Sequence, residues 1–385
     1  MELYIFNRDL ELKGILDTFT SLRWIRRYSK TGEFELHCTL NFNTLELLKK
    51  ENIIYKKDDI EAGYIDTRQL KIGEDGEEYL EIKGKFLTNY LDRRISWDRV
   101  SFDGKTENLM RELVYYNAIN PTNLDRKIPN LILGDLKGFN ESIKYTNSFG
   151  NIIEQLENIS NTNNLGYRNI LDIKSRKILF DVYKGVDRTI NNGTIAPCIF
   201  SRDFENILEQ EYMDSLNNYK NTTLIAGAGE GSARKITSIE NGTGLDRYEL
   251  YVDARDVQDT ETVTVTVNDY DDEGNVTGEH EEDQEVEIPW ERYEPLLLQR
   301  GNEKLSECEE IQTFDSKINT NGNNVYKKDY DLGDIVTVVD KKWGIRIDTR
   351  ITEIEEVYEE KGLEVNVVFG NNIPTIIDKI KQVVR

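Results

Sequence analysis

The chain has 385 residues, of which 38% are apolar, and this length is enough for two or three domains with cores of their own. Seventy-two acidic residues against 49 basic ones give a formal net charge of −23. Because such an anion repels phosphate backbones, the composition argues against nucleic-acid recognition. With two histidines, three scattered cysteines and no CxxC or HExxH motif, it also argues against a zinc site and a secreted disulfide framework.

The first residues, MELYIFNRDLELKG, carry charges at Glu2, Arg8 and Asp9, so they are neither a signal peptide nor a membrane span. No run of about 18 apolar residues occurs elsewhere in the sequence. We therefore expect a protein that is made in a cytoplasm and does not insert into a membrane.

The amino-terminal third is predicted to be β. Apolar and polar residues alternate strictly from Glu33 to Leu40, which is typical of a strand with one buried face, and residues 22–28 predict its hairpin partner. Residues 64–70 and 79–87 predict a second hairpin.

The middle of the chain is predicted to be mixed. Thr106 is expected to cap a helix through Tyr116, and apolar spacing predicts another helix over residues 148–159. Residues 166–172 and 177–182 have strand character. The pattern is β again from about residue 200.

The carboxy-terminal third contains the clearest strand patterns, interrupted by one helical stretch after Pro295. Segments with short connections and little parallel βα patterning favour sandwiches or barrels. The expected strands are residues 247–252, 260–267, 334–339, 345–358 and 363–369, followed by an amphipathic helix over residues 376–384.

One segment differs strongly in charge from the rest. Sixteen acidic residues and two arginines lie between Asp253 and Glu294. Within it, alternation from Thr260 to Ile288 predicts a hairpin with its tip at Asp272–Asn275. We expect this acidic hairpin to stand off the body, where like charges keep it solvated and protect its edges from stray strand pairing.

No motif predicts a catalytic, cofactor-binding or metal site. The glycine-rich segment Ala226–Lys235 lacks phosphate-loop spacing and is expected to be a turn between strands. Asp269–Gly274 only partly matches a calcium loop, because His280 stands where a glutamate is needed. Neighbouring His37 and Cys38 point to opposite faces of a strand and cannot form a catalytic pair, so Cys38 is expected in the core.

Several stretches together resemble one protein family. Residues 244–256 and 299–305 are similar to segments of tail-tip and baseplate hub proteins of phages that infect Gram-positive bacteria. Residues 330–338 continue this resemblance, as do residues 350–358. In the amino-terminal third, the resemblance is to the family's first barrel, and the residues that carry it are Trp24, Tyr28, Gly32–Leu36 and Gly84–Leu87.

The resemblance implies a mainly β fold with an α/β insert and two tail-tube-like β-barrel domains, the baseplate hub architecture. The expected domains are residues 1–100 for the first barrel, 101–200 for the mixed domain and 201–385 for the second barrel, with the acidic hairpin inserted at 258–290. Residue 385 follows the last strand closely, so no fused cell-wall hydrolase is expected.

The implied function is structural rather than enzymatic. Three chains would form a ring that joins the hexameric tail tube to a threefold spike or tip, in a phage tail or a phage-derived contractile (R-type) bacteriocin. The implied partners are tube, spike or tip and other baseplate proteins, and also the tape-measure protein. The protein would be made in the bacterial cytoplasm and end in the particle's baseplate.

Other interpretations remain open at this point. The chain could be a tail-associated cell-wall hydrolase or a carbohydrate-binding protein for host recognition. Its acidity could keep a ring lumen from retaining DNA or tape-measure protein, or could serve solubility alone. A further hypothesis is that the acidic hairpin contacts a more basic baseplate protein.

Overall fold

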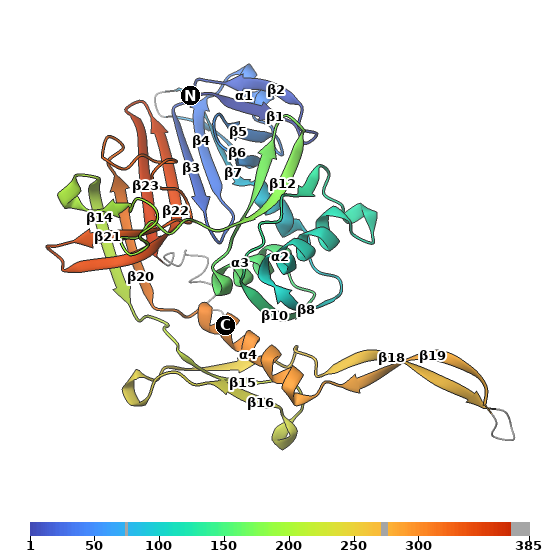
Figure 1. The fold of residues 1–385 in the computed structure, drawn as a ribbon. Helices are drawn as coiled ribbons and strands as arrows, with labels where there is room; N and C mark the ends of the chain where they lie inside the picture. The colour runs from blue at the N-terminus through green and yellow to red at the C-terminus, as the bar shows by residue number, and fades with distance from the viewer. Residues whose placement is uncertain (74–75, 271–275, 371–385) are drawn as a thin grey trace.

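The computed structural model describes residues 1–73, 76–270 and 276–370, and Figure 1 shows how they are arranged. The chain is mainly β, as predicted. A β unit from the amino terminus (blue) lies beside a second β unit from the carboxy-terminal region (orange to red). An α/β part (teal to green) packs against them, and a smaller part below (yellow to orange) carries a long hairpin.

The amino-terminal β unit is an antiparallel sheet that curls around its own core, in the order β2-β1-β5-β6-β7-β4-β3. Trp24 lies in the centre of this core, where its ring packs against Phe86 with centroids 4.6 Å apart. The elements of this unit are β1 (Leu3–Phe6), β2 (Leu12–Leu16), β3 (Ser21–Arg27), β4 (Glu33–Thr39), α1 (Phe42–Leu47), β5 (Ile53–Lys56), β6 (Ala62–Ile72), β7 (Glu78–Phe86) and the 3-10 helix η1 (Leu87–Arg93).

Strict alternation in the sequence explains strand β4. Phe34, Leu36 and Cys38 are buried, whereas the residues between them are half-buried on the opposite face. The two predicted amino-terminal hairpins are therefore confirmed as β3–β4 and β6–β7. Cys38 is the expected core thiol, and burial raises its pKa to about 11.

The α/β part contains both predicted helices. The Thr106 side chain does not cap α2 as expected, because its hydroxyl donates to Asn163 Oδ1 (3.1 Å). Helix α3 begins after Asn151, whose side chain accepts hydrogen bonds from the backbone of the first turn. The elements of this part are β8 (Arg99–Lys105), α2 (Thr106–Val114), the π-helix η2 (Tyr115–Ile119), the 3-10 helix η3 (Leu124–Arg126), β9 (Leu131–Leu133), β10 (Ser142–Ser148), α3 (Ile152–Asn163), β11 (Gly166–Asp172) and β12 (Lys177–Tyr183).

The second β unit also curls around a core of its own. Phe200, Phe314 and Phe369 are fully buried there and contact one another edge-on or tilted. The strands predicted at 334–339, 345–358 and 363–369 are confirmed. The elements are β13 (Ile199–Phe200), η4 (Arg202–Phe204), β14 (Ile207–Ser215), β20 (Ile311–Ile318), β21 (Ile335–Asp340), β22 (Ile345–Glu359) and β23 (Gly362–Gly370).

The two β units share one continuous sheet. Strand β22 pairs antiparallel with β3, from Glu353 opposite Arg27 to Tyr358 opposite Leu22. This ladder links both units into a 13-stranded sheet. The mainly β class with an α/β insert is thus confirmed. In the described residues, two curled sheets are joined through their edge strands β22 and β3.

The smaller part lies between β14 and β20 in the chain. Its helix α4 packs on a three-stranded sheet around Ile225, and Gly301 allows this approach, since a Cβ there would lie 2.4 Å from Ile225 Cδ1. The helix begins at Trp290, six residues before the expected start after Pro295, because burial of its apolar face outweighs the hydrogen bond lost at Pro295. The elements are β15 (Thr222–Ala226), η5 (Gly231–Ala233), β16 (Ile236–Ile239), η6 (Gly244–Asp246), β17 (Glu249–Asp253), β18 (Thr260–Tyr270), β19 (Val276–Glu287) and α4 (Trp290–Ser306).

Two expectations fall outside the described residues, namely the helix over residues 376–384 and the hairpin tip at residues 272–275. In the part of the chain that is described, no helix is long and apolar enough to cross a membrane.

Candidate functional site

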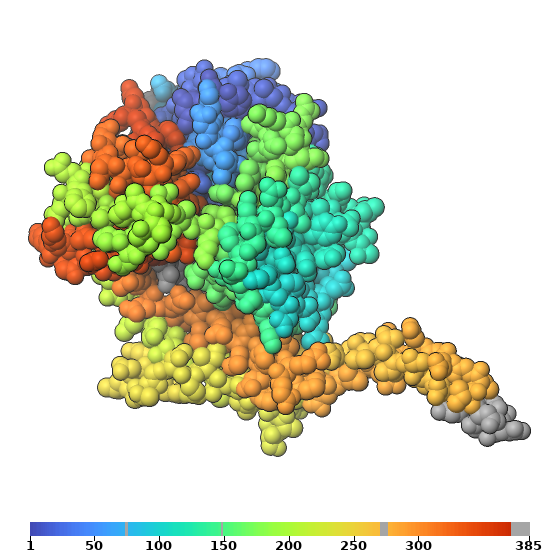
Figure 2. Space-filling model, viewed as in Figure 1, coloured from blue at the N-terminus to red at the C-terminus, as the bar shows by residue number. Residues whose placement is uncertain are grey.

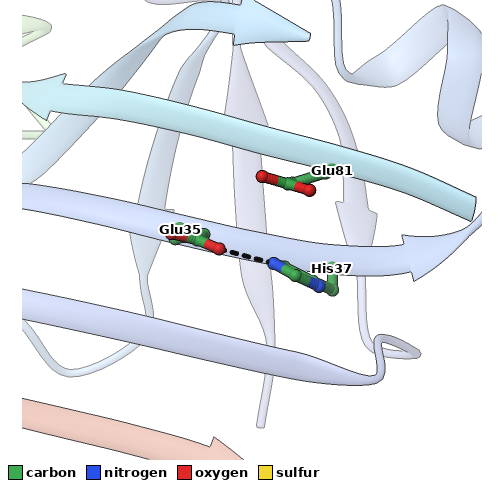
Figure 3. A group of neighbouring side chains, drawn as sticks. All are labelled: Glu35, His37 and Glu81. Atoms are coloured by element: carbon green, nitrogen blue, oxygen red, sulfur yellow. Dashed lines mark hydrogen bonds and ion pairs between the residues drawn. The ribbon is translucent and has the colours of Figure 1, made fainter. Parts of the chain in front are cut away.

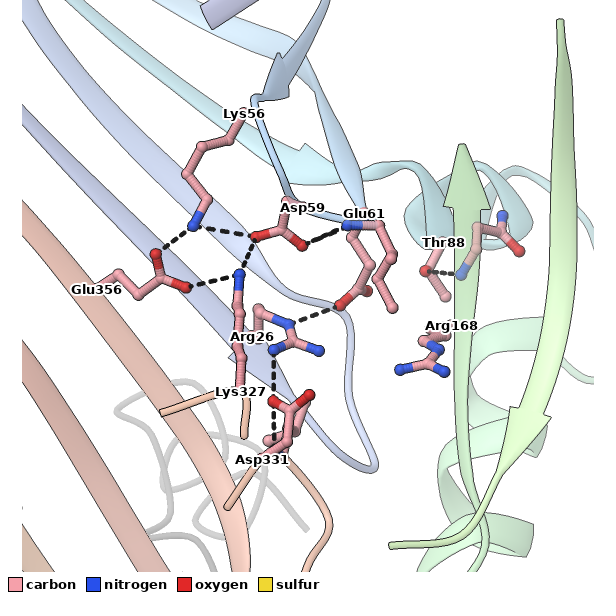
Figure 4. A network of polar contacts seen from close by, with 12 residues as sticks. Arg26, Lys56, Asp59, Glu61, Thr88, Arg168, Lys327, Asp331 and Glu356 are labelled. Carbon is pink, nitrogen blue, oxygen red and sulfur yellow. Dashed lines mark hydrogen bonds and ion pairs between the residues drawn. The ribbon is translucent and has the colours of Figure 1, made fainter. Parts of the chain in front are cut away.

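A buried group of charges lies where the two β units meet (Figure 4). Arg26 comes from β3 and Lys56 from the end of β5, whereas Glu356 comes from β22 of the other unit. All three are at most 2% exposed. The loop after β5 adds Asp59 and Glu61.

Direct contacts link these charges across the junction. Lys56 Nζ contacts Glu356 and lies 3.0 Å from Asp59 Oδ2. Arg26 pairs with Glu61 at 3.1 Å and with Asp331, from the loop before β21, at 2.8 Å. The network therefore joins segments that lie about 300 residues apart in sequence.

Lys327, from the same loop as Asp331, completes the network. Its ammonium group lies 3.3 Å from Asp59 and 3.6 Å from Glu356. Burial opposes ionisation of Asp59, but Arg26 and Lys56 outweigh it and hold its pKa well below the ordinary value. The buried carboxylate is thus kept charged by its cationic neighbours.

The pKa values of Glu356 and Glu61 are shifted in opposite directions. Burial opposes ionisation of both side chains. Lys56 outweighs it at Glu356 and lowers that pKa, whereas burial prevails over Arg26 at Glu61 and raises that pKa. Such a network gives little net stability compared with an apolar core, but removal of one member leaves its partner charged and buried. We interpret the buried network as the feature that fixes the relative orientation of the two β units.

A second group lies on the polar face of the amino-terminal sheet, where Glu35 and His37 are on β4 and Glu81 is opposite on β7 (Figure 3). One potential metal-ligand atom from each side chain lies within 4.8 Å of the other two. His37 Nε2 is 2.7 Å from Glu35 Oε1. The sequence predicts no metal site, and it does not reveal this grouping because Glu81 is distant in sequence.

Lysines already neutralise these carboxylates. Lys83 lies 2.9 Å from Glu81 and 3.4 Å from Glu35, and Lys71 also contacts Glu81. Hydrogen bonds from Lys71 and Lys83 lower the pKa of Glu81 to about 2. A metal ion would have to displace these ammonium groups, so the group is best explained as a cross-strand ionic ladder.

The glycine-rich segment is a turn, as predicted. Residues 227–235 connect antiparallel strands β15 and β16, and Gly229 has φ +93°, which favours glycine. Lys235, which a phosphate site would need free, pairs with Asp259 and Glu287.

The acidic hairpin is also confirmed, as strands β18 and β19. Figure 2 shows it projecting from the smaller part as a separate arm. His280 lies 2.8 Å from Asp269 within the arm. Most of the calcium-like segment, residues 271–275, falls outside the described structure.

The fold can now be compared with solved structures. The tail protein from Neisseria meningitidis MC58 aligns with a TM-score of 0.56 and 12% identity, covering 96% of both chains. The 43 kDa tail protein of prophage MuSo2 from Shewanella oneidensis aligns with a TM-score of 0.54 and 12% identity, covering 96% of this chain and 98% of that one. The fold is therefore that of phage tail proteins.

The sequence itself identifies the family. Residues 2–371 match the family described as siphovirus ReqiPepy6 Gp37-like protein, so the chain belongs to that family. No curated protein sequence matches the chain. The resemblance to phage tail proteins that the sequence motifs indicated is confirmed.

Proposed function

We propose that this chain is a structural hub subunit at the distal end of a phage tail. Three copies would form a ring between the hexameric tail tube and a threefold tip or spike. The proposal is supported by the family match over nearly the whole chain and by the tail-protein fold. The family's siphovirus origin favours a phage tail over a contractile bacteriocin.

The arrangement of the β units agrees with this role. We retain the division into residues 1–100, 101–200 and 201–385 as part of the proposal. Two curled sheets are joined by one strand ladder and a buried ionic network, and in this proposal each sheet would supply one wall segment. Three such subunits would supply six segments, which is the number that a hexameric tube presents.

We propose that the role is structural rather than catalytic. Both histidines contact carboxylates on sheet surfaces, and two of the three cysteines, Cys38 and Cys198, are buried. Burial raises the pKa of the Cys198 thiol to about 12, which makes it a poor nucleophile. In the described residues, no observation favours cell-wall hydrolysis or carbohydrate binding over the structural role.

The observation that carries the proposal is the family match over residues 2–371 together with the fold. The test is to disrupt the gene in its phage and to label purified particles with an antibody against this chain. We expect label at the distal tail end only, and no complete tails after disruption, with recovery when the gene is supplied in trans. Complete, infectious tails without the protein would refute the proposal.

A further inference from the structure

The acidic arm is anchored at its root, and past the root Figure 2 shows it projecting away from the body. We define the arm as strands β18 and β19. At the root, Arg292 forms a bidentate ion pair with Glu261, and Lys235 forms an ion pair with Glu287. Ile288, just after the arm, is buried in the core of the smaller part.

Past this root, the arm is a two-stranded ribbon surrounded by solvent (Figure 2). Strand β19 has 12 residues, which at about 3.3 Å per residue extends for about 40 Å. Isolated two-stranded ribbons are marginally stable in water. An arm of this length is therefore expected to be covered in the assembled state.

The register of the arm gives its two faces different chemistry. On one face, Thr262, Thr264 and Thr266 lie opposite Glu285, Asp283 and Glu281. This face is entirely polar and acidic.

The other face carries an apolar stripe. Val263, Val265 and Val267 lie along β18 on this face, with Glu282 and His280 as neighbours on β19. Residues 260–288 contain eleven acidic residues and no lysine or arginine. The arm thus presents a stripe of valines surrounded by acidic side chains.

The same chain carries a patch of the opposite character on the α/β part. We call it the arginine patch, formed by residues 94–97 and 124–127. Arg94 donates to the backbone carbonyl of Arg126, and Arg126 stacks over the Trp97 ring at 4.2 Å. Trp97 is 49% exposed and Leu124 is 71% exposed.

The arginine patch carries more positive than negative charge, with Asp125 inside it and Asp98 acting on Arg126 from beside Trp97. Most cations of the described residues form ion pairs, but Arg94, Arg126 and Lys127 form none with another described residue. Burial and the neighbouring Arg126 lower the pKa of Arg94, as expected where positive charges crowd together. The patch is thus an exposed apolar surface flanked by cations whose charge Asp98 and Asp125 only partly offset.

We propose that the arm of one copy docks on the arginine patch of the next copy. The valine stripe and the exposed Trp97 and Leu124 would form the apolar centre, and carboxylates of the arm would meet the guanidinium groups at the rim. Because arm and patch are different surfaces, the contact is heterologous and generates a ring when the rotation closes. The inference rests on the proposed function only for the ring of three; the contact between copies stands by itself.

The test is charge exchange in the purified full-length chain, read out by sedimentation equilibrium. The arm variant is E281K/E282K, and the patch variant is R94E/K127E. We expect each to weaken self-association about tenfold or more, since each loses at least one close charge pair. Combining all four substitutions restores opposite charges and should recover most of the association, and high salt should weaken only the wild type and this combination.

The matched control is E359K/E360K, which makes the same charge change at the exposed end of β22 and in the turn that follows, and should leave association unchanged. Thermal melting of every variant checks folding, and K127E alone, at an exposed side chain, replaces the patch variant if that variant melts early.

A chain that stays monomeric throughout, or associates equally well with either variant, overturns the inference. So does loss of binding to another, basic tail protein in the arm variant while self-association persists. Absence of the protein from tail tips would refute the proposed function without affecting this result.

Discussion

Glu355 and Glu356 are neighbours on β22 and point to opposite faces of the sheet. Glu355 pairs with half-exposed Arg23 at 2.5 Å, whereas Glu356 lies in the buried network. We expect E356Q to lower the free energy of unfolding by about 3–5 kcal/mol, because Lys56 loses a buried partner. The matched variant E355Q should cost less than about 1 kcal/mol.

Chemical denaturation at neutral pH measures both variants. Equal effects of the two substitutions would show that the buried charges do not constrain the junction of the β units.

Asp315 is a half-buried carboxylate whose surroundings disfavour its charged form. It lies on β20 opposite Glu211, and burial, Glu211 and Glu353 raise its pKa to about 6. Because the folded-state pKa lies above the ordinary value, Asp315 does not reduce the free energy of unfolding below about pH 4, where it is protonated in both states. As the pH rises through 6, its ionisation is less favourable in the folded than in the unfolded state, and stability is lost. D315N should therefore stabilise the protein at about pH 8 by about 1–2 kcal/mol and have little effect at about pH 4.

Denaturation at both pH values tests this expectation. The control is D214N, at an exposed position on the adjacent strand β14, which should change stability little at either pH. A stabilisation of D315N that is the same at both pH values would contradict the assignment.

Among the elements, the arm should be dispensable for folding of the isolated chain. Replacement of residues 263–284 by a two-residue Asn-Gly turn keeps the root pairs of Glu261 and Glu287, so we expect the free energy of unfolding to change by less than about 1 kcal/mol. By contrast, Y293F removes hydroxyl bonds to Val257 and Ala228 at the root and should cost about 1–3 kcal/mol. Thermal melting distinguishes the two, and a large loss on deletion of the arm would show hidden contacts with the body.

Elements with strong local patterns can be predicted from the sequence. Alternation alone predicts β4, and alternation combined with acidic charge predicts the β18–β19 arm. The start of α4 is predicted six residues too late, because Pro295 disfavours a helix interior locally whereas tertiary packing keeps the chain helical through it.

The remaining features depend on pairs far apart in the chain. The β3–β22 ladder and the Lys56–Glu356 contact each join residues about 300 positions apart or more, and neither partner carries a local pattern that identifies the other. The grouping of Glu35 and His37 with Glu81 follows from the β4–β7 register in the same way. Among 72 acidic residues, a single carboxylate gives no sign of its partner.

At the scale of the whole molecule, a structural role predicts that the purified chain has no lytic activity. Zymography on peptidoglycan from Gram-positive cell walls should show no cleared zone, next to a control hydrolase that gives one. A cleared zone that tracks with the folded full-length chain would favour the alternative of a tail-associated cell-wall hydrolase.

The most direct measurement is a cryo-electron microscopy reconstruction of the tail tip of the parent phage. We expect density for three copies of this chain around the tail axis, between the last tube ring and the tip, with both β units of each copy in the ring wall. Six copies, a single copy, or density for this chain away from the tail axis would contradict the proposed hub.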